Sequence, residues 1–74
     1  AQSARTLGEV LKKQRTECRM TQEFVAAAIG VSRQAVSKWE SGASAPSTTN
    51  LMALAKLFQI APEELLKEVQ GINE

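Results

Sequence analysis

The chain has 74 residues, of which 43% are hydrophobic and only 4% aromatic, and its formal net charge is +1. This length allows one small domain with a modest core, and the composition is that of a globular protein built mainly from aliphatic side chains. With one Cys and no His, the chain has no internal disulfide and no conventional zinc site, so we expect no structural metal.

Several other classes of protein have little support in the sequence. There is no run of about 20 apolar residues and no charged-then-apolar leader, so we expect no membrane span and a cytoplasmic location. The chain also lacks His, Asp and a glycine-rich phosphate loop, so an acid–base pair would have to be made from Glu and Lys. We therefore expect no enzyme, no catalytic residue, no cofactor and no small-molecule ligand.

The first predicted helix begins after Thr6 and runs to about Cys18. Thr6 and Glu9 form a Thr-x-x-Glu capping box at its start. Its apolar side contains Leu7, Val10, Leu11 and Cys18. We expect Cys18 to be a small buried apolar group and not a redox switch.

Two short helices joined by a tight turn are predicted between residues 21 and 42. Gly30 can take a positive φ without a Cβ clash, and Ser32 follows it as the cap of the next helix. Ala26 lies four positions before Gly30, where a methyl group lets the two helix backbones approach closely. This arrangement predicts a helix-turn-helix.

The second helix of this motif, from about Arg33 to Ser41, has two chemically different sides. Ala35, Val36 and Trp39 form the apolar side, so Trp39 is expected to pack in the core and not to stack on a base. The opposite side, called here the polar stripe, consists of Arg33, Gln34, Ser37, Lys38 and Ser41. It has long hydrogen-bonding side chains and no carboxylate, which suits the base edges and phosphates of a DNA major groove.

Two more helices are predicted after Pro46. The fourth runs from near Ser47 to near Phe58, because its apolar residues Leu51, Leu54, Ala55 and Phe58 are spaced i, i+3, i+4 and i+7. Pro62 suits the first turn of a fifth helix, where Glu63 and Glu64 face the positive end of the helix dipole, and Gly71 is expected to end it.

The pattern of the central motif resembles the Cro/C1-type helix-turn-helix family of bacterial and phage transcription regulators, also called the phage-repressor or xenobiotic-response-element family. The matching residues are Thr21-Gln22, Ala26, Gly30-Val31-Ser32, Val36-Ser37-x-Trp39-Glu40-x-Gly42 and Pro46. The resemblance covers roughly residues 5–69. It implies an all-α, compact five-helix, lambda-repressor-like DNA-binding domain that occupies residues 1–74, with the motif at its second and third helices.

The resemblance also implies a function and partners. We expect a sequence-specific regulator of transcription that binds double-stranded DNA, more often a repressor, encoded by a bacterium or phage and located in the cytoplasm or on the nucleoid. One recognition helix contacts only a few base pairs, so a homodimer and a two-fold-symmetric operator are expected. The alternative is a protein-interaction or antitoxin-like module that keeps the fold. It predicts an apolar surface patch from Ile60, Leu66, Val69 and Ile72, which would serve equally well for homodimerisation.

Roles in DNA binding are expected for the polar residues of the motif and its flanks, and that of Gln22 is implied by the family resemblance. Arg33 and Gln34 are expected to contact guanine and adenine through paired hydrogen bonds. One turn later, Ser37 is expected to contact a base edge or methyl group, and Lys38 either guanine or a phosphate. The expected phosphate contacts are Gln22, Ser32, Ser41, Ser44 and Thr48. The loop Gly42–Ala45 has no charge, unlike in relatives with basic residues there, so the salt dependence of binding should be comparatively low.

Charged residues are distributed unevenly along the chain. Residues 1–46 carry seven basic and four acidic side chains, a net charge of +3, and residues 47–74 carry two basic and four acidic ones, a net charge of −2. The motif lies in the basic part, as a DNA-facing surface requires. Arg15 and Glu40 match positions that form a semi-buried ion pair in the family; the alternative is two independent surface charges.

Overall fold

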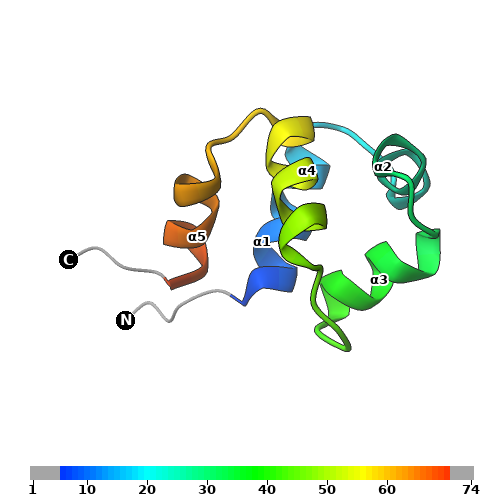
Figure 1. The fold of residues 1–74 in the computed structure, drawn as a ribbon, viewed down its shortest axis with the longest axis horizontal. Helices are drawn as coiled ribbons and strands as arrows, with labels where there is room; N and C mark the ends of the chain where they lie inside the picture. The colour runs from blue at the N-terminus through cyan, green and yellow to red at the C-terminus, as the bar shows by residue number, and fades with distance from the viewer. Residues whose placement is uncertain (1–5, 71–74) are drawn as a thin grey trace.

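The computed structural model describes residues 6–70, which form five α-helices and no strand. The helices are α1 (Leu7–Glu17), α2 (Gln22–Ile29), α3 (Arg33–Ser41), α4 (Thr48–Phe58) and α5 (Pro62–Gln70). α5 lies at one end of the molecule and α2 and α3 at the other (Figure 1). α1 packs on α3 and α5, α2 packs on α3 and α4, and α4 packs on α5. The prediction of an all-α, five-helix domain is confirmed.

Each of the first four helices starts after a hydroxyl residue that caps it. The side chains of Thr6, Thr21, Ser32 and Ser47 each accept a hydrogen bond from the backbone N–H three residues later, at 2.9–3.2 Å. These bonds satisfy N–H groups that have no partner inside the helix. Because Ser47 is the cap, α4 begins at Thr48. α1 ends at Glu17, one residue earlier than predicted.

The tight turn between α2 and α3 has the predicted geometry. Gly30 adopts a left-handed conformation with φ of 80°, and nothing lies within 4 Å of where a Cβ would stand. The backbone N–H groups of Gly30 and Val31 both donate to the carbonyl oxygen of Ala26 at 2.9 Å. This closes the end of α2, and Ser32 then caps α3.

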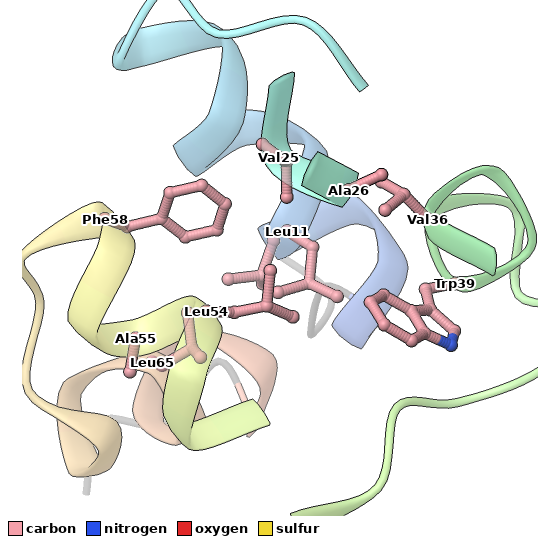
Figure 2. Packing of buried hydrophobic residues seen from close by; sticks show 10 residues of the cluster. Leu11, Val25, Ala26, Val36, Trp39, Leu54, Ala55, Phe58 and Leu65 are labelled. Atoms are coloured by element: carbon pink, nitrogen blue, oxygen red, sulfur yellow. The ribbon is translucent and has the colours of Figure 1, made fainter. Parts of the chain in front are cut away.

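A single cluster of ten buried apolar residues joins the helices (Figure 2). Val10 of α1, Val25 of α2 and Leu65 of α5 are completely buried. Trp39 of α3 is 6% exposed and belongs to this cluster, as predicted. Cys18 is only partly buried and packs against the edge of the cluster.

Gly8 allows α1 to approach the carboxyl end of α3 closely. A Cβ atom at this position would lie 2.5 Å from the carbonyl oxygens of both Trp39 and Glu40. Both obstacles are backbone atoms, so a side chain at position 8 requires one of the two helices to move. This role of Gly8 was not predicted from the sequence, because it depends on the contact with α3.

We expect Gly8→Ala to lower the free energy of unfolding by about 1–3 kcal/mol, the usual cost of overpacking. This is opposite in sign to the helix propensity of Ala, which alone would stabilise the variant by about 1 kcal/mol. Urea denaturation followed by circular dichroism measures the difference. Gly30→Asn is the control, because that site has open space and Asn tolerates a positive φ. A Gly8→Ala variant as stable as the unsubstituted protein would contradict this account of the contact.

Candidate nucleic-acid interface

α3 turns its apolar side to the core and its polar stripe to the solvent. Val36 and Trp39 are buried, whereas four residues of the stripe, Arg33, Gln34, Lys38 and Ser41, are exposed and Ser37 is partly buried. The one carboxylate of α3, Glu40, has a side chain that is only 6% exposed. The exposed stripe therefore combines two cations with neutral hydrogen-bonding groups and contains no negative charge.

The predicted ion pair between Arg15 of α1 and Glu40 of α3 is present. Arg15 donates from Nε to Oε2 of Glu40 at 2.6 Å and from Nη2 to Oε1 at 3.1 Å. Its remaining nitrogen, Nη1, donates to the backbone carbonyl of Met20 at 2.8 Å. With side chains 13% and 6% exposed, this is a mostly buried pair and not two independent surface charges. It ties α1 and the turn after it to the last turn of α3.

Gln22, predicted to grip a phosphate, makes a contact inside the protein that the sequence did not indicate. Its Nε2 donates to Oε1 of Glu40 at 3.0 Å. The amide has two hydrogens on this nitrogen, so one of them still has the capacity to donate outward. Glu40 thus holds the side chain at the start of α2 in place, although the two residues are 18 positions apart.

The hydroxyl groups predicted to contact phosphates differ in whether they are free to donate a hydrogen bond. The oxygen of Ser32 accepts the capping bond from Ala35, which leaves its hydrogen free to donate. The Ser41 hydroxyl donates to the carbonyl of Lys38 at 3.1 Å, so a phosphate contact requires this bond to break. Ser44 and Thr48 are exposed, in the loop after α3 and at the first position of α4.

A hollow of about 260 Å³ lies between α1, α2 and α3 beside the polar stripe. It is lined by charged and polar residues, whose aliphatic stems also contribute to its surface: Lys12, Arg15, Gln22, Ser37, Glu40 and Ser41. The structure therefore brings Gln22 together with two residues of the stripe. Lys12 was not predicted as a site residue, because α1 carries several cations and only the docking of α1 shows which of them face α3.

The apolar surface patch predicted on the last two helices is largely absent from the described residues. Ile60 and Val69 are partly buried and pack against the core, and Ile72 lies outside the described residues. Leu66, at 45% exposure, is the member that remains accessible. Phe24 and Met52, which the sequence analysis did not single out, are 55% and 52% exposed.

Residues 6–70 contain no group of three or more side chains that could hold a metal ion. Across the same residues, no helix combines the length and the apolar character needed to cross a membrane. The one cysteine, Cys18, is a free thiol.

A short helix that is apolar inside and polar outside, joined by a glycine turn to the helix packed across it, defines a helix-turn-helix domain. A family model described as "Helix-turn-helix" matches residues 11–65. The chain belongs to this family, and the Cro/C1-type resemblance of its motif is confirmed.

Named relatives and a solved structure agree with this assignment. The chain is 39% identical over 61 residues to the HTH-type transcriptional regulator DicA of Escherichia coli strain K12, covering 82% of this chain and 45% of DicA. It is 43% identical over 58 residues to the HTH-type transcriptional activator BcrR of Enterococcus faecalis, covering 78% of this chain and 28% of BcrR. The chain thus spans less than half the length of either relative.

The structural comparison leads to the same class of fold. The crystal structure of the P22 c2 repressor protein in complex with a synthetic operator superimposes with a TM-score of 0.81 at 34% sequence identity. The match covers 88% of this chain and 98% of the repressor chain. The lambda-repressor-like fold predicted from the sequence is confirmed.

We expect Glu40→Leu to lower the free energy of unfolding by about 3 kcal/mol, because it leaves the mostly buried Arg15 charge without its partner. The double variant Arg15→Met/Glu40→Leu should recover most of this loss, since both charges are then gone and much of the volume is kept. Urea denaturation of the three proteins gives the comparison.

The matched control is the partly exposed pair of Lys13 and Glu68, whose Nζ and Oε1 atoms are 3.5 Å apart and whose side chains are 36% and 31% exposed. Glu68→Leu is expected to cost less than about 1 kcal/mol, because solvent screens this pair. Equal losses for the variants at Glu40 and Glu68 would show that the buried pair has no special structural role.

Proposed function

We propose that the protein is a sequence-specific regulator of transcription that binds double-stranded DNA and acts as a repressor by occupying an operator. The observation that carries this proposal is the polar stripe of α3, which is exposed and free of carboxylates because Glu40 turns inward. Such a helix fits a major groove, where base edges and phosphates present many acceptors. The similarity to a transcriptional regulator, a transcriptional activator and the operator-bound P22 repressor supports this class.

In the proposed complex the first turn of α3 enters the groove most deeply. Arg33 and Gln34 belong to this turn and are exposed, so they can form paired hydrogen bonds with guanine and adenine respectively. Lys38 lies about one turn later on the same stripe and reaches either a base or the backbone. Ser37 occupies the edge of the stripe next to the hollow.

Phosphates are bound from the flanks of the motif. Gln22 at the start of α2, Ser32 at the cap of α3, and Ser44 and Thr48 beyond α3 offer donors without a charge. Ser41 contributes only if it gives up its bond to the carbonyl of Lys38. Neutral donors orient the protein on DNA but release few counterions, so they add little to the salt dependence of binding.

Selection from a randomised duplex library tests the proposal. We expect a two-fold-symmetric site with half-site centres about 10 base pairs apart. Gln34→Ala should relax the preference at one position in each half and weaken binding by about 1–3 kcal/mol per half-site, the value of a paired base contact.

Gln14→Ala is the matched control for this experiment, because Gln14 lies on α1 and donates to Glu68 of α5, away from the stripe. It should leave the selected sequence unchanged. If no sequence is enriched at low or moderate salt, direct recognition by α3 is wrong. The alternative, a protein-interaction or antitoxin-like module, would then be favoured.

We further propose that the regulator binds its operator as a homodimer whose contact includes α5. α3 and α5 lie toward opposite ends of the molecule, whose longest dimension is 36 Å (Figure 1). Two copies that meet near α5 therefore keep their α3 helices far apart, as binding to successive major grooves about 34 Å apart requires. Leu66 of α5 is apolar and 45% exposed, so it is available to such a contact.

Leu66→Glu is expected to weaken binding to a full two-half-site duplex by about tenfold, roughly 1.4 kcal/mol, because the new charge would be buried between copies. Binding to a single half-site should not change. Fluorescence anisotropy on both duplexes gives the ratio of affinities, which cancels any direct effect on DNA binding. Met52→Glu is the control, since Met52 is similarly exposed but lies on α4. If the ratio of full-site to half-site affinity is the same for the unsubstituted protein, Leu66→Glu and Met52→Glu, then α5 is not part of the dimer contact.

A further inference from the structure

The hollow between α1, α2 and α3 adjoins the surface that the proposed function places against DNA. Ser37 and Ser41 line it and also belong to the polar stripe of α3. In the proposed complex, the DNA backbone that flanks the groove occupied by α3 therefore lies next to this hollow. What the hollow can bind depends on its charge and on its free donors.

The charges in the hollow leave one cation in excess. Arg15 and Glu40 are paired through two hydrogen bonds and neutralise each other. Lys12 is the remaining charged group of the lining, is exposed, and takes part in no salt bridge with any residue from 6 to 70. The hollow thus has a net charge of +1, which matches a single phosphodiester anion.

Two lysines that are neighbours in the sequence serve different sides of α1. Lys13 reaches Glu68 of α5 at 3.5 Å and helps to join these two helices. Lys12 faces the hollow on the α3 side instead. Because of this division, Lys13 provides a control of the same chemistry on the same helix.

Hydrogen-bond donors accompany the charge. Gln22 uses one amide hydrogen for Glu40, and its second one can point into the hollow. The Ser37 hydroxyl makes no hydrogen bond to another group within residues 6–70, whereas the Ser41 hydroxyl donates to the carbonyl of Lys38. Lys12, Gln22 and Ser37 therefore form a set of one cation and two neutral donors around the same space.

We propose that this hollow seats one phosphate of the DNA backbone, with Lys12 supplying the charge and Gln22 and Ser37 the neutral hydrogen bonds. This inference rests on the proposed function and extends it. It assigns a role to Lys12, and it makes Ser37 a phosphate contact where the sequence suggested a base contact. It also supplies a charged backbone contact that the uncharged loop after α3 lacks.

The test compares Lys12→Gln with Lys13→Gln on the duplex selected for the unsubstituted protein. Affinity is measured by fluorescence anisotropy as a function of salt concentration. Losing one phosphate contact makes the negative slope of log affinity against log salt less steep by about 0.9 per protomer, which is a loss of roughly eightfold in affinity per half-site at about 0.1 M salt. We expect this loss for Lys12→Gln, retention of the slope for Lys12→Arg, and no change of slope for Lys13→Gln.

The selected sequence distinguishes phosphate from base contacts. Lys12→Gln and Ser37→Ala should both weaken binding to all sequences alike and leave the preferred site unchanged. An unchanged slope for Lys12→Gln, or a relaxed preference at one base pair, would overturn the inference while operator binding by the unsubstituted protein still stands. Failure of the unsubstituted protein to select any site would instead overturn the proposed function. Unfolding curves confirm that each variant is folded.

Discussion

The Glu40 carboxylate holds three helices together, and the placement of α3 depends on it. It accepts hydrogen bonds from Arg15 of α1 and from Gln22 of α2. Hydrogen bonds to a charged group are stronger than neutral ones and impose direction, which apolar packing does not. α3 is only nine residues long, and it packs on both α1 and α2. Its last turn is held by Glu40, by Trp39 in the core and by the close approach of Gly8. The position of its first turn is set by the turn at Gly30.

This arrangement also determines which charges reach the surface. Pairing Glu40 with Arg15 removes one negative and one positive charge from the face that contains the polar stripe. Arg33 and Lys38 on α3 and Lys12 on α1 remain exposed there. The chain has a net charge of only +1 and generates a weak long-range field, so in the proposed complex the attraction to DNA depends on the local placement of a few cations.

Local features of the fold could be predicted from the sequence, because each has a local cause. The predicted caps Thr6 and Ser32, the glycine turn and the apolar spacing place the helix ends to within about one residue, and the spacing of Val36 and Trp39 identifies the buried side of α3. The pair of Arg15 and Glu40 was predictable only from the family resemblance. The contact of Gln22 with Glu40, the approach of Gly8 to α3 and the orientation of Lys12 were not predicted. Each of these depends on how helices dock, and no spacing within one helix encodes that. The partial burial of Ile60 and Val69 was not predicted for the same reason, since it results from their packing against the core.

In the proposed complex, the contact between Gln22 and Glu40 links the two kinds of DNA contact physically. Phosphate contacts set the register of a protein on the duplex, and base contacts then give specificity, so both must keep a fixed relative position. Gln22 lies at the start of α2, and the base-contacting side chains lie on α3. A hydrogen bond of 3.0 Å from Gln22 to a carboxylate on α3 makes a displacement of α3 move the phosphate donor as well. The same carboxylate is anchored by Arg15 to α1, which carries Lys12. The residues that contact the DNA backbone and those that contact the bases are therefore linked through the mostly buried Glu40 carboxylate. This link can keep the two sets of contacts in register without a charged loop after α3.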